Sequence, residues 1–245
     1  MAVDLDDVQE ARELLADARC VLFDFDGPIC RLFPRSASKR VARELVAKVD
    51  ELGFPEVLTD AVRSVDDPHA VLGAVHQAGQ RRDVTELLPV IEGMVTKGEL
   101  DAADEAVGKS RGTKGAERLI RMLSGRRVRL AVVTNNSPLA AKSYLKQMNL
   151  LGHFAHIHGR TADPGLMKPD PDVLTRALGS LRLRPEDAVM IGDTGTDVEA
   201  AKRAGVRFLG YGRDERKIRG LREAGAGTVV SSYLPLVEDE LGRGD

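Results

Sequence analysis

The chain of 245 residues has no tryptophan, only two cysteines, and few aromatic residues, which make up 4% of it. Cys20 and Cys30 are too few to hold a chain of this length together by disulfides, so we expect reduced thiols and a cytoplasmic protein. No apolar run approaches the roughly 20 residues that a membrane helix needs. The acidic start, Asp4 to Asp7, has no apolar segment, so we expect no secretory signal.

An excess of charge of one sign is also lacking. The formal net charge is −2, from 36 basic and 38 acidic residues. This balance gives no electrostatic reason to expect nucleic acid or an anionic membrane as a partner. A local site can still be cationic, so a small phosphorylated metabolite remains an open partner. The length allows one large domain or two small ones, and a monomer is the default expectation.

Short apolar runs that end in turn residues predict strands, and segments with helical spacing lie between them. The expected strands are residues 20–23, 128–134, 155–159, 188–192, 206–211 and 228–230. The expected helices between the later strands lie near residues 114–124, 137–149, 171–180, 195–204 and 214–224. This alternation predicts an α/β, Rossmann-like core, in which a parallel sheet is covered by helices on both faces.

The segment after the first strand differs from the rest of the chain. From about residue 34 to 110, apolar residues recur at helical spacing and no strand pattern is present. The predicted helices lie around residues 41–49, 70–75, 87–95 and 100–107. About 80 residues are enough for a small domain. We therefore predict an inserted α-helical cap domain at residues 31–111, with linkers near 30–36 and 108–114, and a core formed by residues 1–30 and 112–245.

Asp24 and Asp26, at the end of the first expected strand, are the most informative residues of the chain. Alternate residues of a strand point to the same side, so these two carboxylates share a side. Two neighbouring like charges are unfavourable unless a cation, a shared proton or a reacting group accounts for them. Because open α/β sheets bind ligands at the carboxyl ends of their strands, the pair predicts a functional site.

Three further segments carry polar residues to the same predicted edge of the sheet. Thr134 and Asn135 end the second strand, Lys168 stands at the start of a helix, and Asp193 and Asp197 follow a later strand. A cation, hydroxyl and amide groups and several carboxylates are the groups that phosphoryl transfer needs. The sequence therefore predicts that these segments converge on a phosphoryl-transfer site.

Each residue of this set has an expected role. Asp24 would attack phosphorus to form an aspartyl-phosphate, and Asp26 would protonate the leaving alcohol and later activate water. Lys168 would pair with Asp24 and offset charge as it builds on the phosphate. Mg²⁺ prefers oxygen ligands, and its expected ligands are Asp24, Asp26, Asp193 and Asp197. The residues expected to hold the phosphate are Gly27, Thr134, Asn135 and Lys168.

These segments, in this order, resemble the four motifs of the haloacid dehalogenase superfamily, a group of mostly phosphatase enzymes that use an aspartate nucleophile. Asp24 matches the nucleophile and Asp26 the acid/base. The other matches are Thr134 to the phosphate-binding hydroxyl, Lys168 to the motif lysine, and Asp193 and Asp197 to the acidic metal motif. The helical segment resembles the family's mobile cap, in the layout that phosphoglycolate phosphatases and β-phosphoglucomutases share. The resemblance implies a Mg²⁺-dependent hydrolase of a small phosphomonoester.

Two other functions remain open at this point. A phosphomutase would use the same residues and return the phosphoryl group to its substrate. A non-catalytic protein that uses phospho-Asp24 as a switch would need neither Asp26 nor the cap. The sequence does not identify the substrate, because the basic residues of the cap carry no motif. The candidates for substrate contact there, none of them favoured over the others, are Arg31, Arg35, His69, His76, Arg81 and Arg82.

Overall fold

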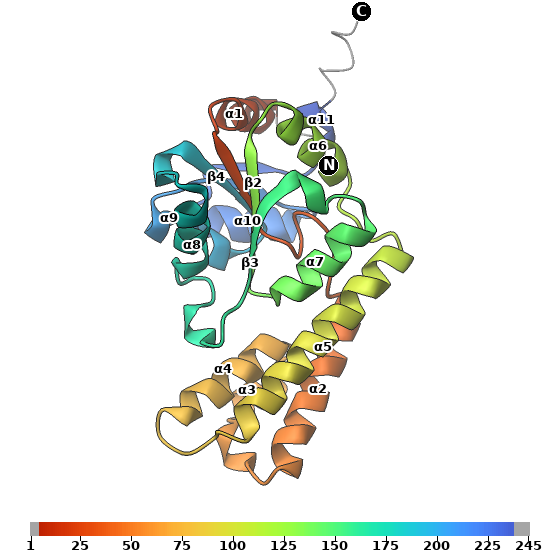
Figure 1. Ribbon diagram of the computed structural model, residues 1–245, viewed down its shortest axis with the longest axis vertical. Helices are drawn as coiled ribbons and strands as arrows, with labels where there is room; N and C mark the ends of the chain where they lie inside the picture. The colour runs from red at the N-terminus through yellow and green to blue at the C-terminus, as the bar shows by residue number, and fades with distance from the viewer. Residues whose placement is uncertain (1–4, 238–245) are drawn as a thin grey trace, which may run out of the picture.

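The computed structural model describes residues 5–237, which form an α/β core and a group of helices beyond one end of it (Figure 1). The centre of the core is one six-stranded parallel sheet in the order β3-β2-β1-β4-β5-β6. Its strands are β1 (Cys20–Phe23), β2 (Arg129–Val133), β3 (Phe154–His158), β4 (Ala188–Gly192), β5 (Arg207–Tyr211) and β6 (Thr228–Val230). The predicted Rossmann-like fold and all its expected strands are confirmed.

Helices connect the strands and cover both faces of the sheet (Figure 1). The core helices are α1 (Leu5–Ala16), α6 (Ala116–Gly125), α7 (Pro138–Gln147), α8 (Asp172–Leu181), α9 (Gly195–Ala204), α10 (Glu215–Glu223) and α11 (Leu234–Val237). Short 3-10 turns are η1 (Pro55–Val57), η2 (Leu151–His153), η3 (Pro164–Leu166) and η4 (Pro185–Asp187). None of the helices in residues 5–237 is both long and apolar enough to cross a membrane.

The sequence of β1 explains why both faces are covered. Val21 and Phe23 pack into one apolar cluster with α1, α6 and α7, whereas Cys20 and Leu22 pack into another with α8 and α9. All four residues are completely buried. A strand that is buried on both faces has an unbroken apolar sequence instead of an alternating one, and this is the pattern that precedes Asp24.

The strand order brings three strand ends together. Phe23 at the end of β1 lies beside Val132 of β2 and Ile191 of β4. The backbone N–H of Asp24 donates to the carbonyl of Ile191 at 2.9 Å, so the ladder continues one residue past β1. Because parallel strands end at the same edge, the segments that follow β1, β2 and β4 leave the sheet side by side. Ligands of open α/β sheets bind at this edge.

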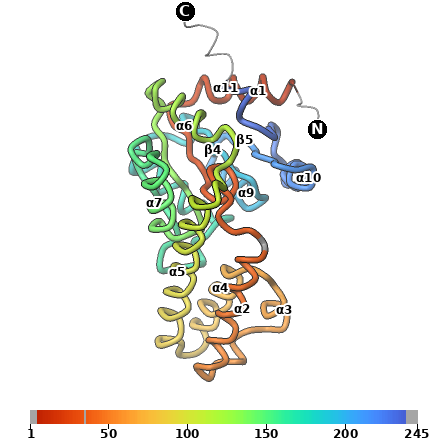
Figure 2. Tube along the Cα trace, turned by 90° about the vertical axis from the view of Figure 1, so that its right-hand side faces the viewer, coloured from red at the N-terminus to blue at the C-terminus, as the bar shows by residue number. Residues whose placement is uncertain are grey.

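The helical segment between β1 and α6 is called the insert here, and Figure 2 shows it beyond the end of the core. Its helices are α2 (Arg35–Glu51), α3 (Asp60–Ser64), α4 (Pro68–Gly79) and α5 (Leu87–Gly108). The insert has an apolar cluster of its own, in which Leu45, Leu72 and Ile91 are completely buried. Its division from the core into a separate domain stays a prediction.

Helix α5 corrects the predicted number of helices in the insert. The spacing predicts separate helices at 87–95 and 100–107, but these residues form one helix of 22 residues. Its first half packs in the cluster of the insert, whereas Ala102, Ala103 and Ala106 belong to the core cluster and pack near α7. The buried residues of α5 follow one face of the helix throughout, but Glu99 stands where an apolar residue would continue the series. This charged residue divides the apolar pattern into two shorter stretches.

Candidate active site

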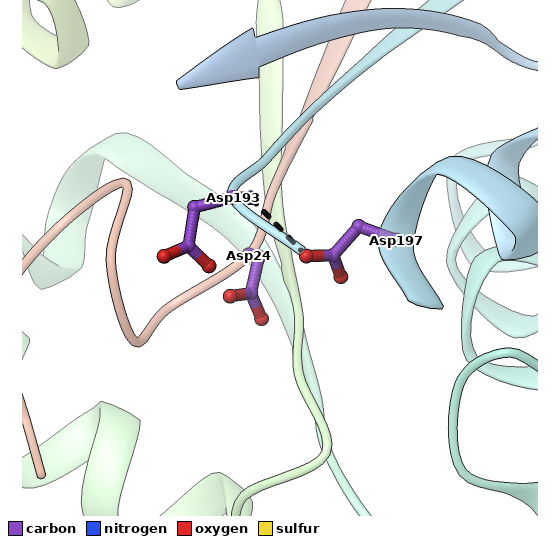
Figure 3. A group of neighbouring side chains, drawn as sticks. All are labelled: Asp24, Asp193 and Asp197. Carbon is purple, nitrogen blue, oxygen red and sulfur yellow. Dashed lines mark hydrogen bonds between the residues drawn. The ribbon is translucent and has the colours of Figure 1, made fainter. Parts of the chain in front are cut away.

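The polar residues expected from the separate segments meet in one pocket, of about 510 Å³, between the carboxyl end of the sheet and the insert. The core residues that line it are Asp24, Asp26, Thr134, Asn135, Asn136, Met167, Lys168, Thr194, Thr196 and Asp197. The insert and the segment leading to it contribute Phe33, Ser38, Asp67, Pro68, His69 and Ala70. Asp193 lies behind this lining. Figure 3 shows the carboxylates of Asp24, Asp193 and Asp197 gathered around one region.

Lys168 joins two of these carboxylates. Its Nζ donates to Asp24 Oδ1 at 2.7 Å and to the carbonyl of Val133 at 3.0 Å, and it lies 2.6 Å from Asp197 Oδ1. The lysine side chain is only 3% exposed, so water screens these charges little. Burial lowers the pKa of Lys168, but Asp197 and Asp24 outweigh it and hold the pKa above its usual value. Lys168 therefore remains a cation between the two acids.

The two acids after β1 have raised pKa values. Burial raises the pKa of Asp24; Lys168 opposes the shift, and Asp197 and Asp193 add to it. Burial, followed by the charge of Asp193, raises the pKa of Asp26 from 3.8 to about 6. A cation close to Asp24 and Asp193 would favour their ionised forms. Without such a cation, the acidic groups of the site outnumber its positive charges.

Asp26 and Gly27 are fixed by the turn that follows β1. Asp26 Oδ1 accepts from the N–H of Leu32 at 2.8 Å, and Oδ2 accepts from that of Phe33 at 3.4 Å. Gly27 has a φ of +123°, and a Cβ there would lie 2.4 Å from Cγ of Asp193. Only glycine combines this φ with so close an approach. The structure thus gives Gly27 a place against Asp193, whereas its expected contact with phosphate remains a prediction.

The loop after β2 ties Lys168 to the start of α7. Asn135 Oδ1 accepts from the backbone N–H of Lys168 at 2.7 Å, and its Nδ2 donates to the carbonyl of Lys168 at 3.1 Å. Thr134 Oγ1 accepts from the N–H and from Nδ2 of Asn136, both at 3.2 Å. Ser137 caps α7 by accepting from the N–H of Leu139 at 3.2 Å. We call residues 134–137 the phosphate loop, after the phosphate contact expected of Thr134 and Asn135, which stays a prediction; a helix N-terminus favours anions.

Asp193 and Asp197 stand on either side of the start of α9. Asp197 Oδ2 accepts from Thr194 Oγ1 at 2.6 Å and from the N–H groups of Asp193 and Thr194 at 3.2 and 3.0 Å. Asp193 Oδ2 accepts from Lys217 Nζ at 2.7 Å. Lys217, on α10, is a site residue that the sequence does not reveal, because one lysine in a charged helix carries no pattern.

A divalent cation fits the acidic group. One carboxylate oxygen of each of Asp24, Asp193 and Asp197 lies within 4.8 Å of the others. Asp193 Oδ1 is buried without a hydrogen-bond partner, and a buried polar atom in that state calls for a ligand. The donors are all oxygens, which suits Mg²⁺. Asp197 Oδ1 also accepts no hydrogen bond from the described residues, but it lies 2.6 Å from the cationic Lys168 Nζ, and Oδ2 accepts from Thr194. Asp24 and Asp193 are therefore better placed to contact an ion directly.

The insert brings a second set of residues to the pocket. His69, one of the six basic candidates, lines the pocket and lies against Glu99 of α5, with 2.9 Å between Nε2 and Oε1. His76, on the same helix α4, instead contacts Asp163 at 2.9 Å, away from this pocket. Glu99 and its other partner, Arg160, carry no sequence signal. Glu99 stands within an amphipathic stretch, and its partner is 61 residues away along the chain.

Comparison with known proteins agrees with this geometry. Residues 18–205 match the family model described as haloacid dehalogenase-like hydrolase. A phosphoglycolate phosphatase of Aquifex aeolicus is 32% identical over 200 residues, which cover 77% of this chain and 82% of that protein. A phosphoglycolate phosphatase of Mesorhizobium japonicum is 29% identical over 206 residues, which cover 81% and 86%.

A solved structure shares the whole fold. The β-phosphoglucomutase of Clostridium difficile superposes with a TM-score of 0.63, at 17% identity, over 92% of this chain and 100% of that one. At this identity the likeness shows the fold alone, and it extends over both the sheet and the insert. The family model and the phosphatase relatives carry the assignment further: the chain belongs to the haloacid dehalogenase-like hydrolases and is a hydrolase of their phosphatase group.

Proposed function

We propose that this protein is a Mg²⁺-dependent phosphatase that hydrolyses a small phosphomonoester through an aspartyl-phosphate on Asp24. The observation that carries the proposal is the buried group in which Lys168 joins Asp24 to Asp197. Asp26 lines the same pocket. The relatives named phosphoglycolate phosphatase support hydrolysis over other outcomes and make phosphoglycolate the first compound to test.

Asp24 is the nucleophile in this proposal. Lys168 donates to its Oδ1, whereas Oδ2 accepts no hydrogen bond from the described residues. Oδ2 is therefore the oxygen that attacks phosphorus, and its bond to phosphorus forms as the bond to the leaving oxygen breaks. Lys168 holds the carboxylate in place and offsets negative charge as it builds on the phosphoryl oxygens.

Asp26 moves the protons. With a pKa of about 6, it keeps a protonated fraction near neutral pH and can give that proton to the leaving alcohol oxygen. In the second half of the reaction it takes a proton from water. The water oxygen then bonds to phosphorus, the bond to Asp24 breaks, and inorganic phosphate leaves. Both carboxyl groups return to their starting states.

The remaining residues hold the phosphate and the metal. Thr134 and the N-terminus of α7 would bind the phosphoryl oxygens. Asp24 and Asp193 would hold Mg²⁺, with Asp26 and Asp197 beside it, and the ion would neutralise charge on the phosphate. Around this point, four carboxylates stand against two lysines. One divalent ion balances that excess.

The test is phosphate release from p-nitrophenyl phosphate, phosphoglycolate and a panel of metabolite phosphates, with Mg²⁺ or with EDTA. Asp24→Asn is compared with Asp17→Asn, which changes an exposed acid outside the site. We expect release by the wild type and by Asp17→Asn in Mg²⁺ only, and none by Asp24→Asn. Mass spectrometry of acid-quenched enzyme should place the phosphoryl group on the Asp24 peptide.

Three results would count against the proposal. Folded, Mg²⁺-loaded wild type that releases no phosphate from any compound contradicts a general phosphatase. A product in which the phosphoryl group has moved to another hydroxyl of the same molecule identifies a phosphomutase instead. Turnover that persists in Asp24→Asn would exclude the aspartyl-phosphate.

A further inference from the structure

A buried charged cluster joins the insert to the core beside the pocket. Its centre is Glu99 of α5, which is completely buried. Glu99 Oε1 accepts from Arg160 Nη1 at 2.8 Å and lies 2.9 Å from His69 Nε2. Its Oε2 accepts from the backbone N–H of Ser137 at 2.7 Å. One carboxylate thus contacts a histidine of the pocket wall, a core arginine and the phosphate loop.

Arg160 holds the same loop from the other side. Its Nη1 also donates to the carbonyl of Asn135 at 3.0 Å, and its backbone N–H donates to the carbonyl of Asn136 at 3.0 Å. Its Nη2 donates to Thr96 Oγ1 of α5 at 3.1 Å. The arginine side chain is 2% exposed. The cluster therefore fixes α5 and the phosphate loop relative to each other.

The ion pair of Glu99 and Arg160 within this cluster is not explained by stability. Burial raises the pKa of Glu99, but His69 and Arg160 outweigh it, and the net pKa lies below its usual value. Buried ion pairs contribute little net stability, because desolvation offsets their attraction, and apolar residues of the same volume often serve as well. A buried ion pair whose carboxylate contacts both His69, at the pocket wall, and the N–H of Ser137 points to a role in positioning.

His69 is the member of the cluster that reaches the pocket. Its Nε2 lies 2.9 Å from Glu99 Oε1 and 3.4 Å from Arg160 Nη1. The shorter contact, with a carboxylate that can only accept, favours a hydrogen on Nε2. Nδ1 makes no hydrogen bond to a described residue, and it accepts one when Nε2 carries the hydrogen of the ring. His76 is a matched contrast on the same helix. Its side chain is also 23% exposed and it also contacts a carboxylate, but it lies outside this pocket.

We propose that His69 recognises the leaving group, by accepting a hydrogen bond through Nδ1 from a hydroxyl that the substrate alcohol carries. This inference rests on the phosphatase function proposed above and names its substrate class: phosphomonoesters of alcohols with a further hydroxyl group. Glu99 and Arg160 are positioning residues. Because Glu99 binds both His69 and the N–H of Ser137, it sets the separation between the hydroxyl and phosphate subsites.

The first test compares glycerol 3-phosphate with propyl phosphate, which has the same three carbons and no free hydroxyl. We expect His69→Ala to lower kcat/KM for glycerol 3-phosphate about tenfold, the value of one hydrogen bond to a substrate hydroxyl. It should leave kcat/KM for propyl phosphate and the inhibition constant of inorganic phosphate unchanged. His76→Ala, the control, should change none of these values.

Three results would overturn the assignment. An equal loss for both substrates shows a structural role only. No preference of the wild type for glycerol 3-phosphate over propyl phosphate excludes hydroxyl recognition. A loss confined to phosphoglycolate shows that His69 binds a carboxylate instead.

The positioning role has a test of its own. Glu99→Gln keeps the shape of the side chain and should lower the same preference about tenfold, and the double variant with His69→Ala should lose no more than either single variant. Additive losses contradict the role. If circular dichroism shows that Glu99→Gln is unfolded, Arg160→Lys takes its place.

If the phosphatase proposal itself is wrong, the wild type releases no phosphate from any compound, and the role of His69 then needs a test that does not depend on turnover. The two phosphate esters and inorganic phosphate are then compared by calorimetric binding to wild type and His69→Ala. Weaker binding of glycerol 3-phosphate alone still supports recognition by His69, and unchanged binding overturns it.

Discussion

The core and the insert place their polar residues in different ways. In the core, Asp24, Thr134 and Asp193 each stand one residue past a strand, and the parallel sheet brings them together. In the insert, Glu99 lies in the middle of a helix and gains its role from Arg160, 61 residues away. Backbone geometry thus sets the proposed chemistry, whereas tertiary packing sets the proposed selectivity. Changes in the two regions should have different effects.

The largest effect is expected in the core, from Lys168→Met. This variant leaves the buried carboxylates of Asp24 and Asp197 without their shared cation. We expect the metal-free protein to lose roughly 3–5 kcal/mol of unfolding free energy and the phosphatase rate to fall roughly 10²- to 10³-fold. Urea unfolding and steady-state kinetics measure the two. Lys202→Met, at an exposed position, should change neither, and a fully active Lys168→Met would contradict the assigned role.

In the insert, the largest effect on stability is expected from its apolar cluster. Ile91 is completely buried, and its neighbour Val90 is 39% exposed. Ile91→Ala should cost about 2–5 kcal/mol, and Val90→Ala roughly 0.5 kcal/mol or less. Hydrogen exchange should show lost protection in α2, α4 and α5, with the sheet unchanged. If protection falls equally in the sheet, the two regions unfold as one unit.

The two regions should also respond to pH with opposite signs. The pKa of Asp26 is raised from 3.8 to about 6 in the metal-free protein, so its contribution to stability is present below pH 4 and is lost as the pH rises to about 6. The pKa of Glu99 is lowered, so its contribution is present above its unfolded pKa and is lost as the pH falls. Each slope is at most about 1.4 kcal/mol per pH unit.

Comparison with isosteric variants separates the pH dependence that each carboxyl group gives to the unfolding free energy from that of the other titrating groups. The unfolding free energy of wild type relative to Asp26→Asn should fall between pH 4 and 6, and that relative to Glu99→Gln should rise with pH. Denaturant unfolding in EDTA at several pH values measures both. Slopes of the same sign would show that the two carboxyl groups occupy similar environments.

The smallest effect is expected at Lys217, which shares Asp193 with the proposed metal site. Removing this cation leaves a more negative site, so Lys217→Met should bind Mg²⁺ roughly tenfold more tightly, a modest effect because the lysine is partly exposed to solvent. Isothermal titration calorimetry measures the affinity, with Lys202→Met as the control. Weaker binding in Lys217→Met would show that Lys217 supports the site instead of competing with the ion.

Sequence patterns predict the core better than the insert, for a physical reason. The strands and the site acids are set by local features: an apolar run buried on both faces, followed by polar residues at the strand end. The side-chain amide of Asn135 hydrogen-bonds to the backbone of Lys168, and Lys217 forms an ion pair with Asp193. Both contacts join distant parts of the chain. No local pattern records such contacts. The continuity of α5 is missed because Glu99, whose burial depends on the distant Arg160, interrupts its apolar series.

The unbroken course of α5 also determines how this enzyme can be recombined with its relatives. A chimera joined at residue 111 would carry a foreign α5 into the host, so that Glu99, the partner of Arg160, would be replaced by a residue of the relative. A junction between Gly98 and Glu99 keeps Glu99, which contacts both Arg160 and Ser137, in the host, and exchanges the half of α5 that packs in the cluster of the insert. The better junction for exchanging the insert between relatives therefore lies inside α5, and not at its end.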